Sequence, residues 1–193
     1  MANAVTSLDG IRLAGLSSDF YHQLQSGAKN LDQFALFLQG KNPFLMSQNK
    51  DSKTLIIAES DTLERLIVRG VYDLVNEKIV KRFSFNKLTI GEWEYRTLSS
   101  SNLISSKDAR ALCEADGWQA GALEHLLVFG AMFPEFQRAN PLIALGSEGL
   151  LGGGRRVPGV WGDGSKRGLD LDWWGDGWHQ DDRFLSVRKV SST

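Results

Sequence analysis

The sequence predicts an α+β fold, and three features lead to that class. Apolar residues recur at helical spacing in several segments, whereas other segments alternate apolar and polar residues with the period of two that half-buried strands show. Between residues 149 and 178 the composition changes, because ten glycines and four of the six tryptophans fall there. The 193 residues suffice for one large or two small domains. We expect a helical and mixed α/β region over 1–90, packed on a second domain over 91–193.

Composition excludes several classes of protein. Lys and Arg number 22 and Asp and Glu 23, interspersed to a net charge of −1, so the chain lacks the basic field of a nucleic-acid-binding protein. The single cysteine, Cys113, has no partner for an intrachain disulfide or a zinc knuckle. No basic start followed by an apolar run marks a secretory signal, and no stretch approaches the ~18 apolar residues of a membrane helix. We therefore expect a protein that does not insert into membranes, cytoplasmic by default.

The first ninety residues predict helices followed by strands. Capping residues and apolar spacing indicate a helix over 17–27 and a second over 31–38, packed as a hairpin. The continuous apolar run within 53–59 predicts a buried strand. Segment 61–76 carries both helical and strand signals, and we favour a helix. Alternation over 78–85 predicts a strand whose Phe83 and Phe85 face a core.

The remaining residues predict further strands and helices in order. A strand over 92–98 holds Trp93, Tyr95 and Thr97 on one face. Ser106 is expected to cap a helix that continues to Asp116, and a second amphipathic helix spans 120–129. A short strand at 142–145 leads into glycine-rich strands joined by tight turns, and a final core strand covers 183–190. Alternation with Leu171 places Trp173 in the core, and we place Trp178 there as well.

This order of elements resembles the C-type-lectin-like fold. In bacterial lectin-like domains a Cys, a Gly-Trp pair and a Glu-Leu-Leu segment precede a glycine-rich stretch and a closing Arg-Phe-Leu-Ala-Val-Arg. The residues that carry the likeness are Ala111-Leu112-Cys113, Gly117-Trp118, Leu123-Glu124-His125-Leu126-Leu127, Ile143-Ala144-Leu145-Gly146-Ser147 and Arg183-Phe184-Leu185-Ser186-Val187-Arg188. Gln119-Ala120 stands where the pattern has Arg-Leu-Pro. The resemblance covers about half the chain and implies that fold for residues 91–193.

Within that fold, the chain looks like a variable protein of a diversity-generating retroelement. In that family a reverse transcriptase rewrites codons in a window just before the C-terminus, and the exposed positions of the window form a ligand-binding face. The resemblance implies a variable region at 155–188. Its scaffold would comprise Arg156, Val157, Pro158, Arg167, Leu169, Leu171, Trp173, Trp178, Arg183 and Phe184. The displayed, ligand-binding positions would be Gly159, Trp161, Asp163, Ser165, Lys166, Gly168, Asp170, Asp172, Trp174, Asp176, His179, Gln180, Asp181 and Asp182.

The function that this resemblance implies is the binding of a protein ligand without catalysis or a cofactor. Rigid tryptophans and short polar side chains on a glycine-supported surface are what a binding surface of that kind needs. Two alternatives stay open: a structural component of a phage or larger assembly, and an enzyme related to the sulfatase-modifying oxidases. The enzyme would require paired cysteines or a histidine-carboxylate metal site, and the sequence contains neither. The oligomeric state also stays open.

Other candidate sites are weaker. Asp170, Asp172, Gly175, Asp176 and Asp181 match positions of a calcium-loop template, but position five is a tryptophan and no helix flanks the loop. We therefore assign no metal ligand, although calcium stays open. Glu124 and His125 are neighbours on a predicted helix and are expected to point to different sides, so they make a poor acid–base pair. The three histidines show no triad or metal-ligand spacing.

Overall fold

A computed structural model describes residues 54–82 and 88–191 of the chain. These residues belong to the second of two compact units, 1–49 and 50–193, and only this second unit is described below. The division falls earlier than the expected boundary at residue 90, because residues 54–82 add two strands to the same sheet and two helices to the same core. The predicted helical hairpin at 17–38 lies outside the described residues, as do Phe83 and Phe85.

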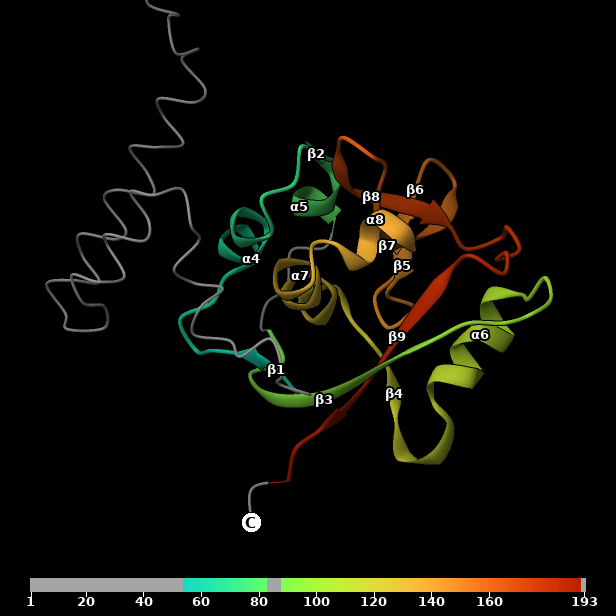
Figure 1. Ribbon diagram of the computed structural model, residues 1–193, viewed down its shortest axis with the longest axis horizontal. Coiled ribbons are helices and arrows are strands. Elements are labelled where there is room, and N and C mark those ends of the chain that lie inside the picture. Colours follow the sequence, from blue (N-terminus) through green and yellow to red (C-terminus); the bar gives the residue numbers. More distant parts are fainter. Residues whose placement is uncertain (1–53, 83–87, 192–193) are drawn as a thin grey trace, which may run out of the picture. The chain divides into compact units, whose positions relative to one another are not determined.

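The described part of the chain is α+β, with nine strands in one mixed sheet and five α-helices (Figure 1). In chain order the elements are β1 (Thr54–Ile57), α4 (Leu63–Gly70), β2 (Leu74–Val75), α5 (Lys78–Arg82), β3 (Gly91–Leu98), α6 (Ser106–Cys113), the 3₁₀ turn η1 (Ala115–Gly117), β4 (Gln119–Ala120), α7 (Leu123–Met132), α8 (Phe136–Ala139), β5 (Leu142–Ile143), β6 (Gly149–Leu151), β7 (Gly154–Gly162), β8 (Arg167–Trp173) and β9 (Arg183–Lys189). The predicted class is thus confirmed.

The sheet is built around the last strand of the chain. Its order is β1-β3-β9-β5-β7-β8-β2, with β4 paired to β9 and β6 to β7. The β3–β9 pair is antiparallel over six residue pairs, from Trp93 opposite Lys189 to Leu98 opposite Phe184. The β5–β9 and β2–β8 pairs are parallel, so the sheet is mixed. The beginning and the end of the region 91–193 therefore lie side by side.

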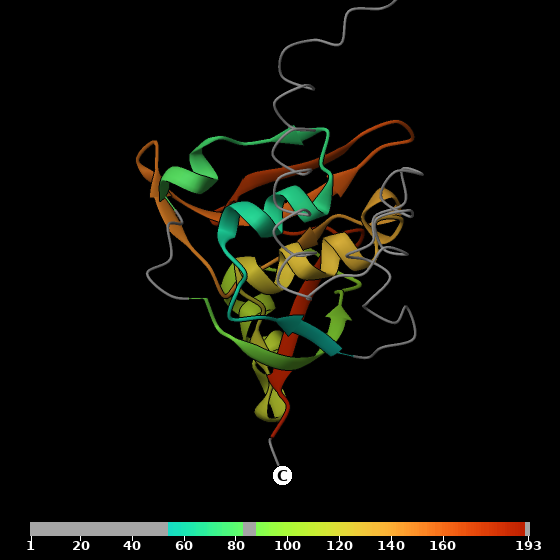
Figure 2. The ribbon, with the colours of Figure 1, turned by 90° about the vertical axis from the view of Figure 1, so that its left-hand side faces the viewer.

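Alternation along the strands supplies two cores, one on each face of the sheet. Helices α4 and α7 lie against each other over one face, where their apolar residues meet those of β1, β7 and β8 (Figure 2). Helix α6 covers the other face, where Ala109 and Cys113 pack with Phe184 and Trp178. Neighbours in β5 separate accordingly, since Leu142 faces the first core and Ile143 the second. All ten residues of α7 are buried, as expected of a helix held between a sheet and another helix.

Helix α7 and several strands appear close to where the sequence places them. The strand predicted at 92–98 is confirmed as β3, and the final strand is confirmed as β9. The run near residue 55 is strand β1, but Ile56 is 45 % exposed while Leu55 and Ile57 are buried. Alternation along β1 directs Leu55 and Ile57 into the core under α4 and α7 and Ile56 to the opposite face, which is exposed.

The strand predicted over 78–85 is wrong for its first five residues, which form helix α5. Asn76 initiates that helix: its side-chain oxygen accepts from the Lys78 N–H at 3.0 Å, and its carbonyl accepts from the Ile79 N–H at 3.0 Å. An asparagine cap of this kind satisfies backbone donors that a strand would pair across a sheet. Ile79 then buries its side chain in the core under α4 and α7.

The segment 61–76 contains both of the structures that its sequence signals suggested. Helix α4 begins after Thr62, whose hydroxyl accepts from the Arg65 N–H, and ends at Gly70. A Cβ at Gly70 would meet the ring of Tyr72 at 2.1 Å, so the chain can turn back only because this position lacks a side chain. The residues that follow form β2, and the helix therefore stops earlier than expected.

The helix after the serine-rich turn is capped by Ser105 and not by Ser106. The Ser105 hydroxyl accepts from the Asp108 N–H at 3.2 Å, and the helix ends at Cys113 instead of Asp116. Ser106 is buried and has a different role, described below. Among the described residues, no helix is both long and apolar enough to cross a membrane.

Candidate functional site

The window 155–188 forms the β7–β8 hairpin, the 174–182 connection and strand β9. The register of the hairpin separates its residues into two faces, because directly opposed residues of an antiparallel pair share a face. Val157, Gly159 and Trp161 oppose Asp172, Asp170 and Gly168. Pro158, Val160 and Gly162 oppose Leu171, Leu169 and Arg167 on the other face, which packs toward α7.

This division separates the residue sets predicted as displayed and as scaffold. Five predicted displayed positions share one face, which we call the Asp–Trp face: Gly159, Trp161, Gly168, Asp170 and Asp172. The predicted scaffold residues of the hairpin lie on the opposite face, with the exception of Val157, which is buried in the second core beside Phe184. The separation arises from strand alternation alone.

Two of the predicted displayed positions are buried beneath larger neighbouring side chains. A Cβ on Gly168 would meet the Trp161 ring at 2.4 Å, and a Cβ on Gly159 would meet Asp172 Oδ2 at 2.4 Å. The prediction that Gly159 and Gly168 are displayed is therefore wrong. Their absent side chains let Trp161 and Asp172 lie flat on the sheet, so the surface consists of the indole, this carboxylate and the exposed Asp170.

The Asp172 carboxylate is crowded by like charges. Partial burial, together with repulsion from Asp170, Asp182 and Asp176, raises its pKa from 3.8 to about 6 against the opposing effect of Arg156. The Asp170 carboxylate has more hydrogen-bond donors, because its Oδ1 accepts from Asn76 Nδ2 and from the Leu171 N–H, each at 2.7 Å. An ionised Asp172 therefore destabilises the folded state at neutral pH.

We expect Asp172→Asn to stabilise the protein by about 1–2 kcal/mol at pH 7.5. Between pH 3.8 and about 6 the folded state binds more protons at this site than the unfolded state, so stability falls as pH rises through that window. Asparagine has a shape similar to that of aspartate but carries no charge, so the substitution removes the repulsion. Urea unfolding at pH 7.5 and pH 4 measures the effect, and the gain should vanish at pH 4. A loss of stability at pH 7.5 would contradict this account, and Asp116→Asn, at an exposed turn, is the control.

The connection 174–182 is anchored by Trp178. Its Nε1 donates to the Ser106 hydroxyl at 2.8 Å, that hydroxyl donates to the Trp174 carbonyl at 2.6 Å, and Trp178 exchanges two backbone hydrogen bonds with Ile104. The side chain is 5 % exposed, so the prediction that Trp178 lies in the core is confirmed. Ser106 thus joins the beginning of α6 to the connection, a role that no local pattern indicates.

An open groove of about 340 Å³ lies between the connection and the beginning of α6. Leu103, Ser106 and Lys107 line one side, and Trp174, Gly175 and Asp176 line the other. Leu103 is 69 % exposed although it rests on Gly177, where a Cβ would meet it at 2.9 Å. The groove adds an apolar hollow, part of which comes from residues outside the predicted window.

The prediction that Trp173 belongs to the core is wrong, because the side chain is 39 % exposed. It points to the same face as Leu171 but is the last residue of β8, beyond the apolar residues contributed by α7. It lies instead on Gly154, with the Arg156 guanidinium carbon 3.4 Å from its ring centroid. Alternation therefore predicted the side on which Trp173 lies but not where the core ends.

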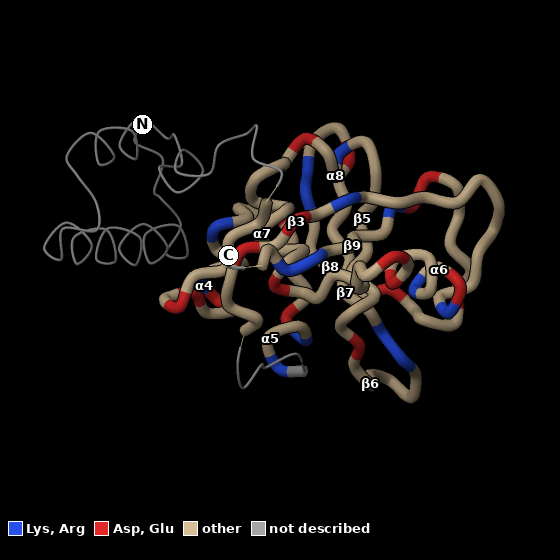
Figure 3. The backbone as a smooth tube through the Cα atoms, turned by 90° about the horizontal axis from the view of Figure 1, so that it is seen from below, with Lys and Arg blue, Asp and Glu red and all other residues tan. Residues whose placement is uncertain are grey.

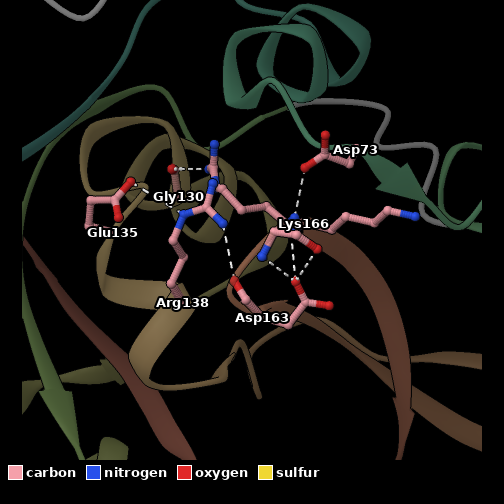
Figure 4. A network of polar contacts seen from close by, with 8 residues as sticks. Asp73, Gly130, Glu135, Arg138, Asp163 and Lys166 are labelled. Carbon is pink, nitrogen blue, oxygen red and sulfur yellow. Dashed lines mark hydrogen bonds and ion pairs between the residues drawn. The ribbon is translucent and has the colours of Figure 1, made fainter.

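The β7–β8 turn, which carries the predicted Asp163, Ser165 and Lys166, lies at the other end of the hairpin. Six residue steps separate it from the Trp173 end, roughly 20 Å at strand spacing. The Asp163 carboxylate accepts from the Lys166 N–H at 2.6 Å and from the Ser165 N–H at 2.7 Å, which holds its pKa below the usual value. Arg138 donates to the Asp163 carbonyl at 3.1 Å (Figure 4). The turn is exposed, but the Asp163 carboxylate already accepts hydrogen bonds from the backbone of the same turn.

The remaining predicted site residues lie in the connection before β9. His179, Gln180 and Asp181 are exposed, and Asp182 is half-buried because its Oδ2 accepts from the His179 N–H at 2.8 Å. Arg183 donates to the Gln180 and Asp182 carbonyls at 2.7 and 3.1 Å. In the described part of the chain, no three His, Cys, Asp or Glu side chains gather closely enough to hold a metal ion.

Comparison with known proteins adds no identity. No protein-family model, curated protein or solved structure matches this chain.

A second polar group includes Glu124 and His125, two buried residues of α7. Glu124 and His125, expected to point to different sides of their helix, both reach Thr89, so that expectation is wrong. The Thr89 hydroxyl donates to Glu124 Oε1 at 2.6 Å, and His125 Nε2 lies 3.5 Å from the same hydroxyl. His125 Nδ1 accepts from the Ala122 N–H at 3.1 Å, so the proton of the neutral ring resides on Nε2. The imidazole cannot then accept the Thr89 proton, and the group acts as an anchor for the chain before β3.

We expect the His125 contribution to stability to be lost as pH falls from about 6.5 to about 4, opposite in sign to the Asp172 contribution, because burial lowers the His125 pKa from 6.5 to about 4 despite the opposing effect of Glu124. Below pH 6.5 the unfolded state takes up a proton that the folded state excludes, so the contribution is complete above that pH. The loss is on the order of 2 kcal/mol. His125→Gln keeps an acceptor for the Ala122 N–H. The difference in the free energy of unfolding by urea between the unsubstituted protein and His125→Gln, measured from pH 4 to 7.5, should follow this titration. A pH-independent difference would contradict the prediction.

Proposed function

We propose that residues 91–193 form a C-type-lectin-like domain of the retroelement variable-protein type, and that its Asp–Trp face and the adjoining groove bind a protein ligand. The order β3, α6, α7, β5, the glycine-rich hairpin and β9 follows the order of elements on which the resemblance rests. One observation carries the functional part: the register of β7 and β8 places five predicted displayed residues on one face and the predicted scaffold residues of the hairpin, except Val157, on the other.

The chemistry of the face supports binding. Trp161 and Trp174 are partly exposed aromatic side chains whose backbones are held in regular strand pairing and by Ser106. Rigid aromatic side chains provide contact area at low entropic cost, and short carboxylates around them supply hydrogen-bond acceptors. The unfavourable crowding at Asp172 also fits a surface selected for binding, because functional sites commonly retain residues that reduce stability.

The first test reads DNA. Under this proposal the genome contains a near-copy of the codons for residues 155–188 that differs chiefly at adenines and lies near a reverse-transcriptase gene. Its adenine positions should coincide with exposed residues of the window and spare Leu169, Leu171 and Trp178. A genome without such a copy would remove the diversified-surface interpretation and favour a structural component of a larger assembly.

A second test measures tolerance to substitution in the full chain. Substitutions at Trp161, Asp170, Asp176 and Gln180 should shift the melting temperature by no more than about 3 °C, whereas substitutions at the buried Leu169 and Leu171 should lower it by about 8 °C or more. Equal sensitivity of the two sets would contradict the assignment of a displayed face.

A further inference from the structure

The class of partner can be inferred from the charges around the Asp–Trp face; this step rests on the proposed function. Five carboxylates lie on the Asp–Trp face and on the connection that follows it. We call them the acidic rim: Asp170, Asp172, Asp176, Asp181 and Asp182. Figure 3 colours the acidic residues of the described chain red and the basic residues blue. Arginines of this region are already engaged: Arg155 lies over the Trp174 ring and pairs with Glu148, Arg156 donates to the Leu171 carbonyl, and Arg183 donates to the Gln180 and Asp182 carbonyls.

Within the rim, Asp172 meets more like charge than opposite charge in the isolated chain. Asp172 lies in the notch over Gly159, where Asp170, Asp182 and Asp176 act on it with the same sign and Arg156 alone opposes them. A cation that approached this face would relieve that repulsion as well as form its own attraction. The face therefore favours positively charged ligands before any specific contact is considered.

The carboxylates are spread in a way that suits several separate cations. They come from β8 and from the connection, and no three of them gather closely enough to hold a metal ion. Asp170 and Asp182 each use one oxygen on a partner within the chain, which fixes their orientation and leaves the other oxygen available. Fixed carboxylates at separate points match the ammonium and guanidinium groups of several side chains.

The aromatic residues beside the rim suit the same kind of partner. Trp161 rests on Gly168, and none of the described Lys or Arg side chains stacks on its ring. Guanidinium groups bind indole faces through cation–π attraction, which strengthens as the pair is removed from water. The groove next to Trp174 provides an apolar hollow for the aliphatic part of a long side chain.

We propose that the partner of this protein presents a basic surface, rich in arginine and lysine, to the acidic rim and Trp161. Complementary charge of this kind accelerates association and selects the partner, and the surrounding apolar contacts prolong the complex. Binding should therefore weaken as salt concentration rises.

The experiment uses the full chain and three twelve-residue fluorescent peptides. At the same positions, the basic peptide contains arginine and lysine, the acidic peptide contains glutamate and the neutral peptide contains glutamine. Fluorescence anisotropy gives Kd at 50 and 300 mM NaCl. The rim variant is Asp170→Asn, Asp172→Asn, Asp176→Asn, and the matched control is Glu59→Gln, Glu64→Gln, Asp116→Asn, which changes the net charge equally at exposed positions outside the rim. If the rim variant does not fold, Asp176→Asn with Asp181→Asn, both in the exposed connection, replaces it.

The basic peptide should bind, and its Kd should rise at least tenfold in the rim variant and less than twofold in the control. Trp161→Ala should raise Kd severalfold without changing the melting temperature by more than a few degrees. Equal losses in the rim variant and the control, equal binding of the three peptides, or no binding of the basic peptide would overturn the inference. Calcium binding by calorimetry that is lost in the rim variant would overturn it in favour of an ion.

These outcomes separate the two proposals. If the genomic template is found but the basic peptide fails, the diversified binding face stands and the inferred partner class does not. If the peptide binds through the rim but no template exists, the partner class stands and the retroelement interpretation does not.

Discussion

Trp178→Ala is expected to destabilise the protein by about 3–5 kcal/mol. The indole is 5 % exposed, its ring centroid lies 6.0 Å from that of Phe184, and its Nε1 donates to Ser106. Truncation leaves a cavity in the second core and removes the N–H that donates to the Ser106 hydroxyl. The connection 174–182 loses its anchor, so the groove beside α6 should open along with the loss of stability.

Urea unfolding and hydrogen exchange measure the two effects. Amides near Ile104, Trp174 and Trp178 should exchange faster, because the pair of backbone hydrogen bonds between Ile104 and Trp178 depends on the anchored ring. Trp161→Ala is the matched control: it removes the same side chain from the Asp–Trp face and should cost about 1 kcal/mol or less. If the two substitutions cost the same, the distinction between anchor and displayed residue fails.

Gly146→Ala should destabilise the protein by about 3 kcal/mol, although it adds only one methyl group. A Cβ at this position would lie 2.3 Å from the Ala120 carbonyl oxygen and 2.8 Å from that of Gly121. Both obstacles are backbone atoms, so no rotamer change relieves the clash. The Gly146 N–H also donates to the Gly121 carbonyl at 2.9 Å, a bond that any displacement would stretch.

Thermal and urea unfolding of Gly146→Ala provide the measurement, with Gly164→Ala in the β7–β8 turn as control. Nothing lies within 4 Å of a Cβ at Gly164, so that substitution should be neutral to within about 0.5 kcal/mol. A neutral result for Gly146→Ala would contradict the close approach between the segments before α7 and after β5.

Local patterns predicted most elements of the described region. Strands β3 and β9 and helix α7 follow periodicities that their own residues carry, and they appear within a few residues of the predicted limits. The errors occur where a single side chain outweighs the pattern. Asn76 initiates a helix where alternation suggested a strand, and Tyr72 folds back over Gly70 to end α4 early.

The site was predicted less completely than the fold. The alternation of β8 separates Asp170 and Asp172 from Leu169 and Leu171, so the polar face of that strand is visible in the sequence. Residues that come from other elements are not. Leu103, Ser106 and Thr89 carry no local signal for their roles, because each role depends on a partner at least 35 residues away in the chain.

The sequence by itself determined the α+β class, the two faces of each long strand and the concentration of tryptophan and aspartate near the C-terminus. Only the tertiary structure decided that Gly159 and Gly168 lie beneath Asp172 and Trp161, that Trp173 extends past the core, and that the carboxylates of one window crowd each other. The physical reason is the range of the interactions. Side-chain direction along a strand repeats every two residues and is local, whereas burial and charge crowding depend on the register between segments that meet only in the folded chain.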